Sequence, residues 1–404
     1  MASNTMKLAD KAEFQLVTTQ AEADALTTIL ACAGVVAIDT EADSMYHYHT
    51  HLCLLQMTLA DANEKLIGTW IVDPLQGLDL SGMFERLSAV PVILFHAADY
   101  DLRLLRKFYG WRPREIFDTM LAARLIGELQ FGLAALTETF LGVVLPKEYQ
   151  RYNWSLRPLK KEVLTYAAND TIYVFKLYPI LRQKLAEMNR TEWHRQMCAH
   201  FISEAWADVP TAPDPETCWR IKGWQSVETD KGLAVLSALW AWREKYAEKM
   251  DRPAFKVMTN ENLIALAHWE ETPANQRVAR LSLPKNIVGG IYRDLQRSLA
   301  QAAALSPSKY PKRKLRSKGT RLSANACLVM NHLRKKRLEW AERIGLDPGF
   351  ALPNGTLESI VRCNPSNVDD LHNCTGVMPW QTDLWGTAIL DEIRKTTEEN
   401  KKAS

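Results

Sequence analysis

A buried β-strand that runs into two acidic residues is the feature that most constrains this fold. Residues 35–38 form a short β-branched apolar run, typical of a buried strand, and Asp39 and Glu41 follow it closely. Side chains two apart on a strand leave the same face, so both carboxylates point to one side. A strand buried by apolar neighbours does not end this way without a counter-charge. We therefore expect a charged centre beside this strand.

The first 207 residues have the pattern of one mixed α/β domain. Apolar runs at 52–59 and 65–73 follow the first strand with short connections, which predicts an antiparallel meander, and 91–95 predicts another buried strand. Apolar residues at helical spacing predict helices over 80–88, 100–109, 118–127, 132–140 and 160–185. Strands that first meander and then alternate with helices indicate a mixed α/β fold.

Three further residues fall where these elements would bring them to the same centre. Asp101 begins the helix after the 91–95 strand, and Tyr166 and Asp170 lie one turn apart on one helix face. Four carboxylates gathered in one place repel one another unless divalent cations lie between them. Oxygen ligands select Mg²⁺ or Mn²⁺. Each piece alone is common, but the set in this order predicts a two-metal site for phosphoryl transfer.

The second half of the chain is helical, with no convincing strand. A proline-rich linker is predicted over 208–226, followed by a helical module over 227–305. A basic linker over 306–320 separates it from a second copy of the module over 321–396, and a polar tail covers 397–404.

The charge distribution and the cysteines indicate which binding partners and which cellular compartment to expect. From Lys309 to Arg337 the chain carries eleven lysines and arginines and no acidic residue, which is typical of a nucleic acid contact and equally of a solvated hinge. The seven cysteines form no CxxC pair, which favours reduced thiols and a cytoplasmic protein. No stretch approaches the ~18 apolar residues of a membrane span. No P-loop or GxGxxG is present, so a nucleotide cofactor is not expected.

The acidic strings resemble the three exonuclease motifs of the DEDD superfamily of 3′→5′ exonucleases, in its tyrosine subclass. Within that superfamily the sequence is similar to the ribonuclease D family. The matching strings are VVAIDTEADSMYHY with LCLLQ, FHAADYDLRLL, IFDTMLAARL, NWSLRPL and LTYAANDTIYVFKLY. The helical modules resemble HRDC domains. The resemblance implies a ribonuclease-H-like α/β exonuclease domain followed by two small all-α HRDC-like domains.

The resemblance also assigns roles to single residues. Two divalent cations, Mg²⁺ or Mn²⁺, are expected to be bound by four acids, with Asp101 acting mainly through metal-bound water and Tyr166 positioning the attacking water. The expected catalytic residues are Asp39, Glu41, Asp101, Tyr166 and Asp170. The implied activity is 3′–5′ exoribonuclease hydrolysis that releases nucleoside 5′-monophosphates. The implied substrates are tRNA precursors and other small structured RNAs with a single-stranded 3′ end.

Five more residues are expected to contact RNA. Gln56 and His96 lie close in sequence to the catalytic acids and are placed against the terminal nucleotide, although His96 is equally well explained as a core histidine. Arg151, Trp154 and Arg157 combine cations and an aromatic ring, which suits stacking and phosphate contact with single-stranded RNA. The alternative for this segment is a packed loop with surface arginines.

Two other functions stay open at this stage. A metal site of this kind does not discriminate the sugar, so a 3′–5′ exonuclease on DNA is the first alternative. A catalytically silent RNA-binding scaffold is the second. The complete set of acids and the tyrosine argues against the scaffold, because a decayed site would normally lack at least one of them.

Overall fold

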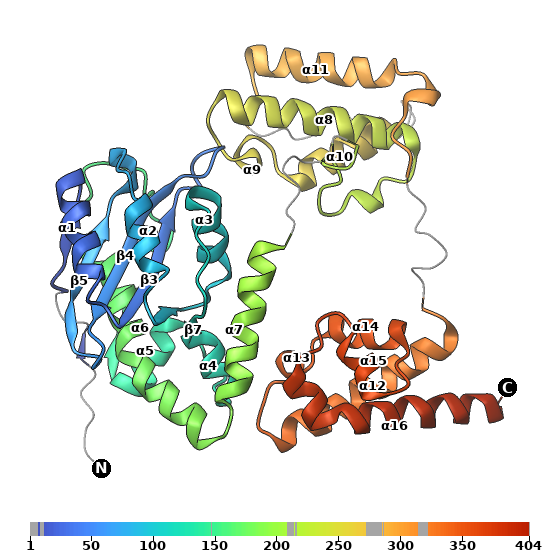
Figure 1. Cartoon of the computed structure of the whole chain (residues 1–404). Coiled ribbons are helices and arrows are strands. Elements are labelled where there is room, and N and C mark those ends of the chain that lie inside the picture. Colours follow the sequence, from blue (N-terminus) through green and yellow to red (C-terminus); the bar gives the residue numbers. More distant parts are fainter. Residues whose placement is uncertain are drawn as a thin grey trace. The chain divides into compact units, whose positions relative to one another are not determined.

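The computed structural model of this chain separates into two compact units (Figure 1). It describes residues 7–8, 12–146, 148–207, 214, 216–271, 285, 287–313 and 322–403. The first unit comprises Met1–Glu41, Leu52–Ala207 and Gly319–Ser404, and the second comprises Ala42–His51 and Asp208–Lys318. Parts of the predicted linkers 208–226 and 306–320 lie outside the described residues. In the described ranges, no helix has the length and apolar character needed to cross a membrane.

A six-stranded sheet lies at the centre of the first unit. Its strands lie in the order β2 (Gln15–Val17), β5 (Leu66–Val72), β4 (Leu52–Ala60), β3 (Val35–Ala42), β6 (Val92–Phe95) and β7 (Phe117–Asp118). The β4 and β5 strands pair antiparallel, as the meander predicts, whereas β2 runs parallel to β5 and the β3–β6 and β6–β7 pairs are parallel. The mixed α/β class is therefore confirmed. A separate pair, β1 (Lys7–Leu8) and β8 (Val143–Val144), runs parallel.

Helices accompany the sheet, and five of them lie where apolar spacing predicts them; those over 20–30 and 191–206 are not predicted. Their bounds are α1 (Gln20–Leu30), α2 (Ser81–Leu87), α3 (Asp99–Tyr109), α4 (Thr119–Leu125), α5 (Leu133–Leu141), α6 (Lys161–Glu187) and α7 (Thr191–Trp206), with a 3₁₀ turn η1 (Pro74–Gln76). The α6 helix matters most for the site because it packs on one face of the sheet. Its Ala167 and Ala168 share a buried cluster with Leu54 of β4 and Ile71 of β5.

The C-terminal helical region belongs to the same unit. It contains α12 (Ala324–Arg343), α13 (Pro348–Ala351), α14 (Asn354–Cys363), α15 (Val368–His372) and α16 (Pro379–Ala403). The Trp193 ring of α7 stacks on the Trp380 ring of α16 at 4.8 Å between centroids. The Gln196 side chain accepts a hydrogen bond from the Trp380 backbone amide, and the Arg190 guanidinium donates to the carbonyls of Leu125 and Ile344. This helical region is thus packed directly on α7.

The second unit consists of a helical module and the short segment that follows β3. The module contains α8 (Asp230–Lys249), α9 (Ala254–Val257), α10 (Asn260–Glu271) and α11 (Gly289–Ala303), with the 3₁₀ turns η2 (Trp224–Ser226) and η4 (Pro307–Lys309). Tyr48 packs against its core, and the Tyr48 backbone amide donates to Asp251. The His47 ring lies 2.6 Å from the same carboxylate. The segment Ala42–His51 is therefore a structural part of this module.

Candidate active site

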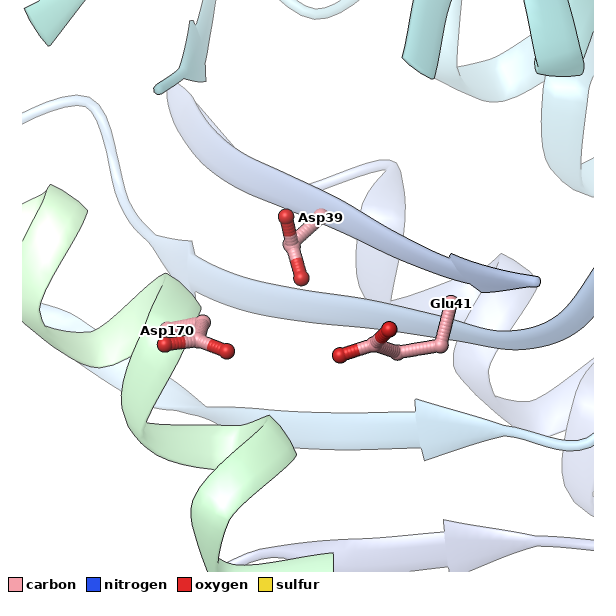
Figure 2. Close-up of side chains that lie close together, drawn as sticks. All are labelled: Asp39, Glu41 and Asp170. Carbon is pink, nitrogen blue, oxygen red and sulfur yellow. The ribbon is translucent and has the colours of Figure 1, made fainter. Parts of the chain in front are cut away.

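Three carboxylates from two elements converge in the first unit. Asp39 and Glu41 come from β3 and Asp170 comes from α6, and Figure 2 shows the three side chains directed toward one another. One ligand oxygen from each residue lies within 4.8 Å of the oxygens of the other two. A Mg²⁺ ion binds oxygen ligands at about 2.0–2.1 Å, so two of its ligands lie at most about 4.2 Å apart. The three oxygens, all within 4.8 Å of one another, are at or slightly beyond the spacing for one shared cation.

The alternation of β3 explains why its two acids face α6. Val35 and Ala37 of this strand share a buried cluster with Val174 of α6. Asp39 and Glu41 continue the same alternation and so extend from the same face of the sheet. The period-two spacing in the sequence is therefore what places both carboxylates against the helix that carries Asp170.

Asp101 is held beside this group but outside it. It lies in the first turn of α3, and the hydroxyl of Thr40 donates a hydrogen bond to its carboxylate. The connection from β6 into α3 passes through Ala97, whose φ of 63° is a left-handed conformation that residues with a Cβ rarely adopt. The structure thus brings three of the four predicted metal-binding acids together and fixes the fourth on Thr40.

The electrostatics of the group call for a cation. Burial, followed by the charge of Asp170, raises the pKa of Asp39 well above its usual range, and burial with the neighbouring acids does the same for Glu41. Burial and then the charge of Asp39 raise the pKa of Asp101, although the Thr40 hydrogen bond opposes the rise. Burial raises the pKa of Asp170 to about 7. A divalent cation reverses these shifts because it favours the ionised carboxylates, and an all-oxygen donor set fits a hard ion.

Tyr166 lies one helical turn before Asp170, as its spacing predicts. Burial, followed by the charges of Asp170 and Glu41, raises the pKa of its hydroxyl. Its ring packs edge-on against Tyr149 at 5.8 Å between centroids and lies close to Trp154. A neutral phenol held this way can donate or accept a hydrogen bond, but it is not a base in the absence of a cation.

Comparison with known proteins decides the family. A family model described as 3′-5′ exonuclease matches residues 14–186, and one described as HRDC domain matches 232–276 and 328–393. The chain is 30% identical over 387 residues to a ribonuclease D of Nitrobacter hamburgensis, covering 93% of this chain and 94% of that protein. The chain belongs to the ribonuclease D family. This ribonuclease D family member is a 3′–5′ exoribonuclease that acts on RNA and uses divalent metal.

Solved structures show the same fold along nearly the whole chain. A protein from Bifidobacterium adolescentis matches with a TM-score of 0.77 at 23% identity, covering 96% of this chain and 99% of the other. The ribonuclease D of Escherichia coli matches with a TM-score of 0.68 at 20% identity, covering 95% and 99%. The folds of the exonuclease domain and of the HRDC region in this ribonuclease D family member are therefore both found in solved structures.

A cavity of about 660 Å³ opens onto three of the predicted catalytic residues. Asp39, Tyr166 and Asp170 line it. The lining also includes residues between α4 and α5 and residues between α5 and α6, among them Leu129, Gln130, Phe131, Gly132, Leu145, Pro146 and Gln150. Sequence analysis missed these residues. They carry no motif in the sequence, and the 86% exposure of Leu129 appears only in the structure.

His96 is the predicted RNA contact that this cavity supports. It lines the cavity beside Asp39, and its Nδ1 lies 2.9 Å from the Thr119 hydroxyl. That hydroxyl donates to the Phe95 carbonyl, so it accepts from His96 Nδ1–H. Burial lowers the pKa of His96, so its ring is neutral and Nε2 keeps an acceptor lone pair.

Three of the other predicted RNA contacts need correction. Gln56 and Trp154 are 0% and 2% exposed, so neither side chain offers a surface to RNA. Arg157 makes a two-pronged ion pair with Asp73, with both N–O distances at 2.6 Å, and also donates to the Cys53 carbonyl. Of the two alternatives for this segment, the packed loop is therefore confirmed for Trp154 and Arg157, and the RNA-stacking surface is wrong. Arg151 is exposed on that loop, and its contact with RNA stays a prediction.

Proposed function

We propose that this exoribonuclease hydrolyses the 3′-terminal phosphodiester of RNA with two divalent cations, Mg²⁺ or Mn²⁺, and releases nucleoside 5′-monophosphates. The observation that carries the proposal is the convergence of Asp39, Glu41 and Asp170, of which Asp39 and Asp170 also line a substrate-sized cavity. When bound, such cations activate a water molecule and stabilise the leaving oxygen. The three carboxylates hold them, and Asp101, tied to Thr40, contributes through water.

Tyr166 orients the attacking water in this proposal. Its position one turn from Asp170 and its place in the cavity wall support the assignment. Because a phenol has an ordinary pKa of about 10, the hydroxyl keeps its proton near neutral pH and acts as a hydrogen-bonding group. The proton lost by the water then leaves through solvent in the cavity.

The neutral His96 supplies a reason to prefer RNA over DNA. Its Nε2 is an acceptor at the cavity wall, and the ribose 2′-hydroxyl is the donor that distinguishes RNA from DNA. Replacing His96 with Ala should therefore lower kcat/KM for a ribose-ended oligomer more than for the same oligomer with a terminal 2′-deoxyribose. Equal losses of kcat/KM on both substrates would contradict the proposed contact between His96 and the 2′-hydroxyl.

The natural substrates in the proposal are tRNA precursors and other small structured RNAs with single-stranded 3′ ends. The ribonuclease D of Escherichia coli is described as an exoribonuclease involved in structured RNA processing, and this chain shares its fold. The cysteines within the described residues form no disulfide bonds, which supports a reducing cytoplasmic location. The predicted domain bounds, 1–207 for the exonuclease and 227–305 and 321–396 for the HRDC-like domains, are part of the same proposal.

A substrate panel tests this function against both alternatives. The full chain is incubated with Mg²⁺ or Mn²⁺ and 3′-labelled oligomers: single-stranded RNA, RNA duplex with a 3′ overhang, blunt RNA duplex, and DNA. We expect labelled mononucleotides first and fastest from the two RNAs with free 3′ ends. Faster release from DNA would favour the DNA exonuclease. No release from any oligomer, in preparations that still bind RNA, would favour the scaffold.

A further inference from the structure

Gln56 carries a buried amide that the fold does not use. The side chain is 0% exposed, and neither its Oε1 nor its Nε2 has a hydrogen-bond partner among the described residues. A buried amide without partners is costly, and evolution can replace it with an apolar side chain of similar size. Such a group in the middle of β4 therefore indicates that its hydrogen-bond partner is a bound ligand rather than one of the described residues.

The neighbours of Gln56 show which way it faces. Leu54 and Thr58 lie two residues away on either side, so all three extend from the same face of β4. Leu54 is in the buried cluster with Ala167 of α6, and the Thr58 hydroxyl lies 2.8 Å from the Thr171 hydroxyl of the same helix. Gln56 is therefore directed at the α6 turn between these contacts.

That turn of α6 carries one of the metal-site acids. Asp170 lies between Ala168 and Thr171, the residues that contact the β4 face. The strand next to β4 is β3, which presents Asp39 and Glu41 on the face that packs against α6. The unpartnered amide and the three carboxylates thus share one layer between the sheet and one helix.

We propose that Gln56 is a positioning residue of the metal site, whose amide hydrogen-bonds the ionised carboxylates or their bound water once divalent cations are present. The inference rests on the proposed two-cation function. An amide N–H donated to a carboxylate fixes the orientation of that carboxylate and leaves its other oxygen for the cation. Partners of this kind typically change metal affinity by about 10- to 100-fold.

The substitution Gln56→Met tests the proposal because methionine has similar length and no hydrogen-bonding amide. In the chelated protein the variant should melt at the same temperature as the wild type or higher, because an unpartnered amide is removed. The dissociation constant for Mn²⁺, measured by calorimetry, should rise about tenfold or more. Stability and metal affinity would then move in opposite directions, which a purely structural residue does not produce.

Thr58→Val is the matched control on the same strand face. The Thr58 hydroxyl is already hydrogen-bonded to Thr69 and Thr171, so its loss should lower the melting temperature and leave Mn²⁺ affinity unchanged. A lower melting temperature or a loss of folding for Gln56→Met would overturn the proposal, because the amide would then have a structural partner. Unchanged Mn²⁺ affinity would overturn it as well. If the wild type itself bound no Mn²⁺ while degrading RNA, the two-cation function would fail independently of Gln56.

Discussion

Removing the divalent cations should make the stability of the exonuclease domain depend steeply on pH. The cause is the group of four neighbouring acids, Asp39, Glu41, Asp101 and Asp170, which all have raised pKa values in the folded state. Below about pH 3 these carboxyls are largely protonated in both the folded and the unfolded chain. As the pH rises, the carboxyls of the unfolded chain ionise first, which lowers the free energy of the unfolded state. The folded state therefore loses relative stability until its own carboxyls ionise.

The pKa shift of Asp170 gives the size of this loss of stability. Its pKa rises from 3.8 to about 7 in the folded protein. Each pKa unit corresponds to about 1.4 kcal/mol, so this carboxyl alone removes about 4 kcal/mol of stability between about pH 4 and 7. For a domain of this size that loss lowers the melting temperature by about 10 °C. Added Mg²⁺ should restore it, and the restoration should grow with pH because the cation displaces protons.

The assay is thermal melting in chelator and in Mg²⁺ across this pH range, from about pH 4 to about pH 8, for the wild type and for Asp170→Asn. Asparagine has the size of the protonated aspartic acid and cannot ionise. The chelated variant should therefore match the wild type at the acidic end and exceed it at the alkaline end, and Mg²⁺ should stabilise it less. Taking the difference between the two proteins cancels every other titrating group. Parallel pH profiles of the two chelated proteins would refute the reasoning.

Four further outcomes follow from the same geometry. Asp39→Ala should abolish mononucleotide release while leaving the circular dichroism spectrum unchanged, because the cation loses a central ligand. Tyr166→Phe should lower kcat by about 10²-fold with unchanged Mn²⁺ affinity, measured by single-turnover kinetics and calorimetry. Thr40→Val should lower kcat and weaken metal binding by releasing Asp101, and Thr40→Ser should restore both. Deleting residues 306–404 should weaken RNA binding more than it lowers the single-turnover rate, with a loss that shrinks at high salt.

The sequence predicts the centre of this site well because two short periodicities control it. Asp39 and Glu41 are two apart on a strand, and Tyr166 and Asp170 are four apart on a helix. Each spacing fixes a shared face with no knowledge of the rest of the fold. The helices α2 to α6 are also predicted within a few residues, since each has one apolar face, whereas α1 and α7 are missed.

The predicted RNA contacts failed where both faces of an element are covered. All nine residues of β4 are buried, so the strand shows no alternation, and a glutamine within it gives no sign of direction. Trp154 lies in a short loop whose arginines and aromatic ring resemble a nucleic acid contact. The structure instead packs the ring under α6 and pairs Arg157 with Asp73. Both errors come from contacts between residues far apart in sequence, 84 positions in the Arg157–Asp73 pair, which local composition does not encode.

Asp101 shows how a correct motif can still leave the geometry open. The order of the acids predicts four carboxylates at one centre, yet among the described residues only three have oxygens that all lie within 4.8 Å of one another. The fourth is held by Thr40, the residue between Asp39 and Glu41, which points away from the face those two acids share. A neutral hydroxyl does not neutralise a carboxylate. Once a bound cation favours its ionised form, Asp101 therefore adds negative potential to the site while staying outside the direct ligand set. Asp39, Thr40 and Glu41 near the end of β3 therefore supply two metal ligands and the hydroxyl that holds Asp101. This division of roles follows from the alternation of side chains on a single strand.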